Sequence, residues 1–477
     1  MIIKIFLSFF LTFLSVYFIE KIARLRSWLS YPRENRWHSR PVALYGGIGI
    51  VFGLYIPLFF PPYPEDFFVL FLILSFFAFL LGLWDDIKPL SPSLKFLLQI
   101  ILASFVVLSG ARISITGRFL IDIFITYFWI LGITNAFNLL DNMDGLSAGI
   151  GIIVACFLFF LFLYTQSPIF PILFLSLLIA SYGAYLIFNF PPAKIFMGDA
   201  GSLFLGFSLS VISIPGYLNK IPYGITSFLS ILLIFSLPIF DTILVTLNRL
   251  YYGKKASEGG KDHTSHRLIF LGFSEPIVNF VLYAISAVGG FLGVYLYLNP
   301  GVGEFLSIIY VLFLFFFGRY ISRLNVYHAY PQGIVFVLEE LFARIKASEI
   351  IIDTVIIGSA YYFAFFMHYE GIKKMFADTY VATLSVAIFV SLLFLFIFGI
   401  YKESRNPLSF EKIEKLISSV IFSDISIKFF SLWFLKKDVK WEVLITYDLL
   451  WFFLFVFSRG IFSYFDHIIK RVKEKKK

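Results

Sequence analysis

The protein has 477 residues, of which 59% are hydrophobic and 14% are charged, with 39 Lys and Arg against 30 Asp and Glu. Soluble domains carry about 25% charged residues, so the composition excludes a soluble globular fold, and it equally excludes a disordered chain. Most of the chain is expected to lie in lipid, and the net charge of +9 to reflect basic cytoplasmic loops, with no nucleic-acid partner. The single cysteine, Cys156, excludes a disulfide framework and multi-cysteine metal sites.

The predicted elements are membrane-spanning helices, because a bilayer core of about 30 Å requires about 20 apolar residues per helix. The sequence therefore predicts an all-α, polytopic integral membrane protein. About eleven spans are predicted first, near 2–22, 43–60, 66–84, 96–110, 119–135, 148–165, 169–188, 201–214, 226–247, 275–297 and 303–320. An amphipathic stretch near 330–347 follows, and then about four spans near 349–367, 379–400, 415–434 and 443–464. The first run has no small-residue cleavage site and is interpreted as a spanning helix.

Loop charge predicts the orientation of these spans. The loop from Lys21 to Arg40 and the loop around 249–267 are both rich in Lys and Arg, and both follow odd-numbered spans. The positive-inside rule then places the N-terminus outside and every odd-numbered exit in the cytoplasm. The basic tail, 470–477, is cytoplasmic if all four later spans cross. We expect a multi-pass protein of the plasma membrane.

Polar side chains gather at the cytoplasmic ends of four odd-numbered spans. They are Asp85, Asp86, Asn135, Asn138, Asp141, Asn142, Asp144, Asp199, Asp262, His263, His266 and Arg267, with Asp241 inside the ninth span. In 135–145 the polar residues alternate with apolar ones, as expected of a segment that lines a cavity at membrane depth. Oxygen ligands of this kind suit Mg²⁺ or Mn²⁺. An EF-hand is excluded because Leu140 would occupy the first ligand position, and zinc at His263 and His266 lacks a clear third ligand.

Several of these segments, in order, resemble the polyprenyl-phosphate N-acetylhexosamine-1-phosphate transferases (glycosyltransferase family 4). They are Gly46-Gly47-Ile48-Gly49, Leu83-Trp84-Asp85-Asp86 with Lys95, the run 135–145, Phe196-Met197-Gly198-Asp199-Ala200-Gly201-Ser202, Asp241-Thr242 and Asp262-His263-Thr264-Ser265-His266-Arg267-Leu268. The resemblance covers residues 1–325. It implies transfer of an N-acetylhexosamine-1-phosphate, with GlcNAc-1-phosphate favoured, from a UDP-sugar to a membrane polyprenyl phosphate of the undecaprenyl or dolichyl type. UMP is released, and lipid-linked glycan synthesis begins.

The resemblance also implies roles for individual residues. Asp199 and Asn138 would hold Mg²⁺, or Mn²⁺, with Asp141 as the alternative to Asn138. Asp85, Asp86, Asp141 and Asp144 would be the catalytic residues. Asp85 and Asp86 would position or deprotonate the lipid phosphate, and positioning is favoured because a phosphate monoester with a second pKa of about 6 needs little general-base help. Lys95, Asn135, Asn138, His263, His266 and Arg267 would bind substrate. The alternative for Lys95 is a snorkelling lysine at a helix start.

The sequence departs from the family pattern in its last loop. Relatives specific for N-acetylglucosamine-1-phosphate often carry His-x-His-His there, whereas Thr264 and Ser265 stand between His263 and His266. A phospho-N-acetylmuramyl-pentapeptide transferase is the second hypothesis. It is less favoured, because the loop 254–262 is short for recognition of a muramyl-pentapeptide. A lipid-linked-sugar transporter is a third, but transporters place ionisable groups near the midplane and not at one face.

Residues 348–477 are predicted to form a separate membrane module, joined to residues 1–325 by an amphipathic cytoplasmic linker, 326–347. The module resembles the membrane region that precedes the catalytic domain of polysaccharide-biosynthesis nucleotide-sugar dehydratases. The matching residues are Glu349–Asp353, Phe398–Tyr401, Asp448 and Arg459. We expect an intramembrane ion pair between Asp353 and Arg459, with snorkelling of Arg459 as the alternative. A homodimer, and docking of downstream glycan enzymes on this module, are further hypotheses.

Overall fold

The computed structural model describes residues 1–32, 40–60, 66–216, 224–255, 260–322, 324, 347–368, 379–401 and 410–474. These residues are almost entirely helical, which confirms the all-α class. The strands within them are β1 (Leu29–Ser30) and β2 (Val42–Ala43), paired antiparallel with Leu29 opposite Ala43.

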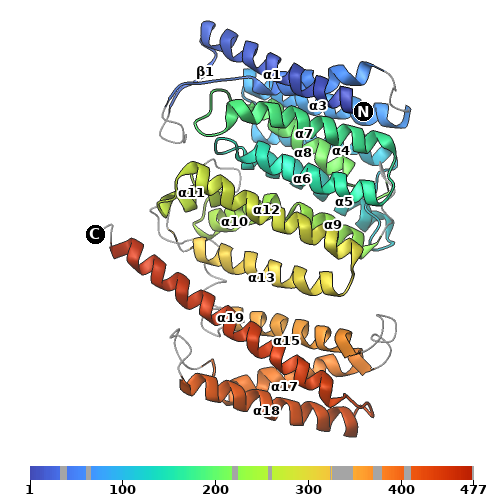
Figure 1. The fold of residues 1–477 in the computed structure, drawn as a ribbon, viewed down its shortest axis with the longest axis vertical. Helices are drawn as coiled ribbons and strands as arrows, with labels where there is room; N and C mark the ends of the chain where they lie inside the picture. Colours follow the sequence, from blue (N-terminus) through green and yellow to red (C-terminus); the bar gives the residue numbers. More distant parts are fainter. Residues whose placement is uncertain are drawn as a thin grey trace. The chain divides into compact units, whose positions relative to one another are not determined.

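The helices follow one another in chain order (Figure 1). They are α1 (Ile2–Leu25), α2 (Gly46–Tyr55), the 3-10 turn η1 (Ile56–Phe59), α3 (Asp66–Ile87), α4 (Pro92–Leu108), α5 (Phe119–Leu140), α6 (Leu146–Tyr164), α7 (Ile169–Asn189), α8 (Gly198–Ile212), α9 (Ile225–Ile234), α10 (Ser236–Tyr251), α11 (Thr264–Phe270), α12 (Glu275–Leu298), α13 (Val302–Ser322), α15 (Ala347–His368), α17 (Thr379–Ile397), α18 (Phe410–Trp433) and α19 (Trp441–Glu474).

Helices occupy all of the predicted spans. Within the described residues, ten helices are long and apolar enough to cross a membrane, or eleven if one bent pair is a single span. Four more positions, Gly46–Phe59, Pro92–Leu108, Gly198–Ile212 and Ala382–Ile397, hold shorter apolar helices. Residues Ala200 to Ile212 of α8 are all buried, and a helix enclosed by protein need not match the bilayer thickness. The chain is thus a polytopic, multi-pass membrane protein.

The ninth predicted span differs from expectation because it is broken. The sequence predicted one continuous helix over 226–247, whereas α9 and α10 meet at an angle of 74°. The break follows from Pro238, whose ring lacks an amide hydrogen and would clash with the carbonyl of residue 234 in a continuous helix. The bend changes the direction of the chain just before Asp241.

The described residues divide into two compact units. The first contains 1–250, 254–300 and Leu324, and the second contains 251–253, 301–322 and the residues from 347 onward. By packing, α13 therefore belongs to the second unit, although the eleventh span was predicted in the domain 1–325. The predicted linker, 326–347, lies outside the described residues apart from Ala347. The assignment of functional domains stays a proposal.

Small residues bring the helices of the first unit close together. A Cβ atom on Gly53 or Gly49 of α2 would collide with Thr12 or Val16 of α1, and one on Gly47 would collide with the backbone of Met197 and Gly201. The Gly46 and Gly47 amides donate to the carbonyls of Phe196 and Met197. The glycine run is a close-packing device, as its position at a helix start predicts.

The second unit contains the predicted intramembrane ion pair. Arg459 Nη2 of α19 lies 3.0 Å from Asp353 Oδ2 of α15, and this carboxylate also accepts a 2.8 Å hydrogen bond from the Tyr401 hydroxyl. Asp353 is fully buried. Asp353, Tyr401 and Arg459 thus meet at one point, and the expectation of the Asp353–Arg459 pair is confirmed.

Candidate active site

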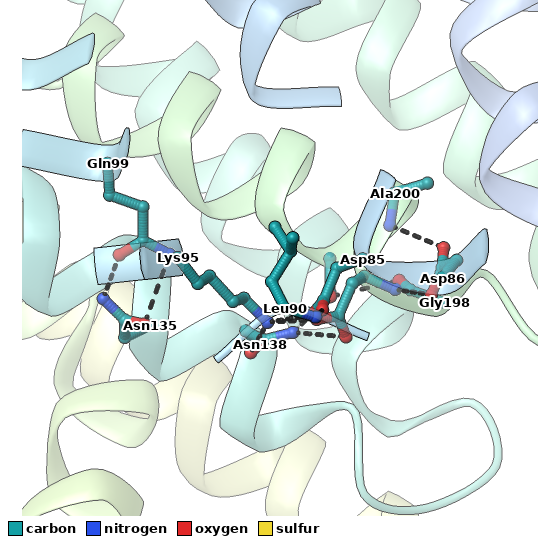
Figure 2. A network of polar contacts seen from close by, with 11 residues as sticks. Asp85, Asp86, Leu90, Lys95, Gln99, Asn135, Asn138, Gly198 and Ala200 are labelled. Carbon is teal, nitrogen blue, oxygen red and sulfur yellow. Dashed lines mark hydrogen bonds and ion pairs between the residues drawn. The ribbon is translucent and has the colours of Figure 1, made fainter. Parts of the chain in front are cut away.

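The site begins where α3 approaches the N-terminus of α8. A Cβ on Gly82 would collide with the Asp199 carbonyl, so only glycine permits this distance. One turn later, Asp86 Oδ1 and Oδ2 accept hydrogen bonds of 2.9 and 3.0 Å from the amides of Asp199 and Ala200. The first amides of a helix lack intrahelical partners, so the Asp86 carboxylate satisfies them and complements the helix dipole. Asp86 therefore anchors the Asp199 segment to α3 (Figure 2).

Lys95 lies at the centre of the network. Its Nζ donates to Asp85 Oδ2 at 3.0 Å and to Asn138 Oδ1 at 3.2 Å, and it also bonds Asp199 Oδ2. Figure 2 shows the Lys95 side chain extended toward Asn138 and Asp85. This geometry differs from that of a snorkelling lysine, because the ammonium is shared among three side chains from α3, α5 and α8.

Local sequence places Lys95 and Asp85 for this contact. Pro92 begins α4, and the Ser91 hydroxyl caps it by accepting from the Leu94 amide at 3.3 Å. Asp85 Oδ1 accepts a 2.6 Å hydrogen bond from the Leu90 amide, which closes the short connection between α3 and α4. The short connection thus keeps Lys95 and Asp85 within hydrogen-bond distance of each other.

Two asparagines of α5 lie one turn apart on the same helix face. Asn138 Nδ2 donates to Asp199 Oδ1 at 2.9 Å and to Ser202 Oγ at 3.0 Å. Asn135 Nδ2 donates to Gln99 Oε1 at 2.7 Å, beside the Lys95 cluster (Figure 2). Asn138 thus belongs to the charged network, whereas Asn135 is held next to it by Gln99.

The loop between α5 and α6 carries two more carboxylates. Burial, and then the charges of Asp199, Asp86 and Asp144, raise the pKa of Asp141 well above its usual range. Burial raises the pKa of Asp144 to about 6, although its Oδ2 accepts a 2.8 Å hydrogen bond from the Ala193 amide. The charges of the acidic cluster therefore act on Asp141, and Asp144 connects its loop to the segment before Asp199.

Two buried carboxylates, Asp241 and Asp262, organise the last loop. His263 Nδ1 lies 2.8 Å from Asp241 Oδ2, and the Thr264 amide donates to Asp241 Oδ1 at 2.8 Å. Arg249 forms two parallel hydrogen bonds with Asp262, Nε to Oδ2 at 2.7 Å and Nη2 to Oδ1 at 2.9 Å. Because the bidentate geometry fixes both partners, the loop is fastened to α10 at its base. The bend between α9 and α10 directs Asp241 to the start of α11.

His266 and Arg267 lie on α11 and are both buried. Burial, and then the charge of His263, lower the pKa of His266 to about 4, so the ring is neutral near pH 7. Arg267 donates from Nε to the Asp262 carbonyl at 2.9 Å and from Nη1 to the Leu324 carbonyl at 2.8 Å. Its contacts with backbone carbonyls hold the loop, and its contact with a sugar-phosphate stays a prediction.

The structure therefore brings the predicted residues together in two groups. Asp85, Asp86, Lys95, Asn138 and Asp199 form one network. In the second group His263 contacts Asp241, Arg267 contacts the Asp262 carbonyl, and the His266 ring lies 6.0 Å from the His263 ring. The Ser265 hydroxyl connects α11 to the loop between α5 and α6 by donating to Asn142 Oδ1 at 2.6 Å.

Sequence reasoning assigned no role to Gln99, Ser265, Asn189, Asn279 or Tyr283, all of which contact the site. A glutamine one turn after Lys95 on an apolar helix was the available signal for Gln99. Ser265, Asn189, Asn279 and Tyr283 lie on α11, α7 and α12, and no sequence pattern distinguishes them from other polar residues of these helices.

The oxygen donors fit Mg²⁺ better than zinc. Asp199, Asp85 and the Asn138 amide surround the Lys95 ammonium. Across the described residues, no three His, Cys, Asp or Glu side chains are arranged to hold a metal ion by themselves. Mg²⁺ is commonly bound by one or two carboxylates, with phosphate oxygens and water completing its octahedron, whereas zinc needs three or four protein ligands. A carboxylate and an amide beside the Lys95 ammonium agree with the first pattern.

Comparison with known proteins agrees with this geometry. A family model described as glycosyl transferase family 4 matches residues 68–217, which include Asp85, Lys95, Asn138 and Asp199. The protein is 32% identical over 328 residues to the probable undecaprenyl-phosphate N-acetylglucosaminyl 1-phosphate transferase of Bacillus subtilis (strain 168), covering 66% of this chain and 90% of that protein.

Two further relatives show how far the similarity extends. The undecaprenyl-phosphate alpha-N-acetylglucosaminyl 1-phosphate transferase of Thermotoga maritima is 30% identical over 54% of this chain and 78% of its own length. The phospho-N-acetylmuramoyl-pentapeptide-transferase of Lactobacillus johnsonii is 34% identical over 37% of this chain and 53% of its own. With the matching site segments and the coverage of the Bacillus protein, these similarities show that the chain belongs to glycosyl transferase family 4.

Proposed function

We propose that the protein transfers N-acetylglucosamine-1-phosphate from UDP-N-acetylglucosamine to a membrane polyprenyl phosphate and releases UMP. The observation that carries this proposal is the Lys95 ammonium held among Asp85, Asn138 and Asp199, next to the capped N-terminus of α8. A fixed ammonium beside two carboxylates and an amide is suited to binding a phosphate group together with a divalent cation. The names of the relatives supply the substrates.

In the proposed reaction, an oxygen of the polyprenyl phosphate attacks the β-phosphorus of the UDP-sugar. A new P–O bond forms, the bond from this phosphorus to the oxygen that bridges it to the α-phosphorus breaks, and UMP leaves with that oxygen. Lys95 offsets the phosphate charge, while His263, His266 and Arg267 form the donor side. Asp85 and Asp86 position the lipid phosphate. Both Asp86 oxygens accept hydrogen bonds from backbone amides of α8, which favours a role in anchoring this helix over a role in proton transfer.

Asp199 and Asn138 would hold Mg²⁺, or Mn²⁺ in its place, which supplies charge neutralisation across the pyrophosphate when bound. Asn135 keeps its position beside the substrate through Gln99. Asp141 and Asp144 lie on the loop between the two groups. A pentapeptide-bearing donor is disfavoured, because that relative matches only 37% of this chain.

We further propose that the site faces the cytoplasm of the plasma membrane, because the basic loops 21–40 and 249–267 are predicted at the same membrane face as the site loops. Downstream glycan enzymes would dock on residues 348–477, and the protein would form a homodimer. Cysteine accessibility of the Lys88 loop in sealed, oriented vesicles tests the orientation.

The activity test uses purified protein in lipid with Mg²⁺, polyprenyl phosphate and UDP-N-acetylglucosamine, with UMP release followed over time. Wild type should release UMP only when the lipid is present, and Asp199→Asn should lose at least about a hundredfold in rate. The matched control is Asp122→Asn, which alters a carboxylate at the opposite end of α5 that bonds Thr116. Equal rates in wild type and Asp199→Asn would refute the assigned site, and no release with any UDP-hexosamine would refute the function.

A further inference from the structure

The loop between α5 and α6 receives three hydrogen bonds from one stretch of the chain. The Ser265 hydroxyl of α11 donates to Asn142 Oδ1 at 2.6 Å. Asn279 Nδ2 and the Tyr283 hydroxyl, both on α12, donate to the carbonyls of Asp144 at 2.8 Å and Gly145 at 2.6 Å. All three donors lie between 264 and 283, and all three acceptors lie between 142 and 145.

These bonds meet a specific need of the loop. Its backbone is irregular, with Gly145 at φ +76°, so its carbonyls cannot all be satisfied by a helix. Gly145 is buried, and its carbonyl already accepts the Gly149 amide at 3.0 Å, so the Tyr283 hydroxyl is a second donor to it. The Asp144 carbonyl receives its donor from Asn279, and a buried carbonyl without a donor is costly. Asn279 and Tyr283 are one helical turn apart and therefore project from the same face of α12. The Gly145 amide is held separately, by Asn189 Oδ1 at 2.9 Å.

The surrounding packing makes room for these donors. A Cβ atom on Gly149 of α6 would collide with the Tyr283 hydroxyl, so glycine at this position lets the hydroxyl reach the loop. Asn279 is fully buried, so water does not compete for the hydrogen bond that its amide donates to the Asp144 carbonyl. The contact is thus built from both sides, by donors on α11 and α12 and by a glycine on α6.

We propose that Ser265, Asn279 and Tyr283 form a positioning clamp that fixes the loop carrying Asp141 and Asp144 relative to the donor-side residues. The proposal rests on the proposed function, because positioning is defined with respect to that reaction. The clamp makes the carboxylate loop and the His263 loop move as one body. A UDP-sugar bound against α11 then meets Asp141 and Asp144 at a fixed separation. Such preorganisation acts on the rate of the transfer step more than on binding.

The first experiment measures loop opening without reference to activity. Hydrogen–deuterium exchange of the peptide that contains 141–146 is compared between wild type, Tyr283→Phe, Asn279→Leu and the double variant. Each single substitution should accelerate exchange about tenfold, the effect expected from losing one buried hydrogen bond. The matched control is Tyr127→Phe, which removes a hydroxyl bonded to Ser104 Oγ at 2.8 Å away from this loop. Unchanged exchange in the double variant overturns the clamp.

The second experiment separates positioning from general stability. In Tyr283→Phe and Asn279→Leu we expect kcat for UMP release to fall about 3- to 30-fold while the KM values change less than about twofold. The double variant should lose less than the product of the single losses, because the residues act on one loop. Gly149→Ala, which displaces the Tyr283 hydroxyl without touching that residue, should reproduce Tyr283→Phe.

The two readouts distinguish failure of the clamp from failure of the proposed function. A lower yield and Tm with unchanged kcat per folded molecule overturns the positioning role and leaves a structural one. Wild-type inactivity with every UDP-hexosamine refutes the function, while the exchange experiment still decides whether the clamp holds the loop.

Discussion

Asn138 and Asp199 are 61 positions apart in the chain, yet Asn138 Nδ2 donates to Asp199 Oδ1 across 2.9 Å. The same asparagine accepts from Lys95 through its Oδ1. Because an amide has one donating and one accepting end, Asn138 contacts both members of the Lys95–Asp199 ion pair. The arrangement leaves Asp199 oriented by three elements, α3, α4 and α5.

Replacement of Lys95 should abolish the fixed positive charge of the site. In Lys95→Met we expect kcat/KM to fall by about a hundredfold or more, because a preorganised cation at a phosphate is among the larger catalytic contributions. Lys88→Met, at an exposed lysine in the same connection between α3 and α4, is the matched control and should retain its rate. UMP release under saturating lipid measures both variants. A Lys95→Met enzyme with wild-type kcat/KM would contradict the role.

Gly82→Ala should separate α3 from α8. The added Cβ would meet the Asp199 carbonyl, and relief of this overlap is expected to lower the unfolding free energy by about 1–3 kcal/mol. The control is Gly132→Ala on α5, where nothing lies within 4 Å of the new Cβ and helix propensity favours alanine by about 1 kcal/mol. Thermal unfolding in detergent compares them. Equal Tm values for the two variants would show that the approach at Gly82 is not tight.

Mg²⁺ should stabilise the folded protein independently of turnover. With UMP and Mg²⁺ together we expect a rise in Tm of several degrees, since a ligand that binds only the folded state shifts unfolding by mass action. EDTA should remove the rise, and Asp199→Asn should not show it. Asp122→Asn should respond like wild type. A full Tm rise in Asp199→Asn would exclude Asp199 as a ligand.

The Arg459–Asp353 pair should be essential to the second unit. Removing one partner of a buried ion pair commonly costs about 3–5 kcal/mol, so Arg459→Met should lower expression and Tm sharply. The double variant Arg459→Met/Asp353→Leu should recover part of the loss, because no buried charge then stays unpaired. Wild-type folding and expression of Arg459→Met would disprove a stabilising pair.

Acid should destabilise the fold partly through His266. In the folded protein the pKa of His266 is lowered from 6.5 to about 4. Between pH 6.5 and about pH 4, the histidine is therefore protonated in the unfolded chain but neutral in the folded one. Stability therefore falls as pH decreases through this window. His266→Gln should show a smaller decrease in Tm between pH 7 and pH 4.5. A decrease identical to that of wild type would contradict the shift.

The sequence by itself determined the all-α membrane class and the positions of the helices. Apolar runs of about 20 residues are a local property, so lipid alone predicts a helix at each one. Polar residues such as Asp85, Asp199 and His263 are conspicuous beside apolar runs. Burying an ionisable side chain in a membrane costs free energy, so such residues are rare there and usually functional. The break before Asp241 was missed, although Pro238 was visible, because hydropathy does not register a bend.

Only the tertiary structure decided what each polar group bonds. Asp86 and Asp199 are 113 residues apart, and Lys95 and Asp199 are 104 apart. Nothing in the sequence distinguishes the carboxylate that caps α8, Asp86, from its neighbour Asp85, which pairs with Lys95. Nor does any spacing connect Tyr283 with Gly145, since this contact depends on how closely α6 and α12 pack. Hydrogen bonds are short-ranged and directional, so their partners follow from helix packing and not from order along the chain.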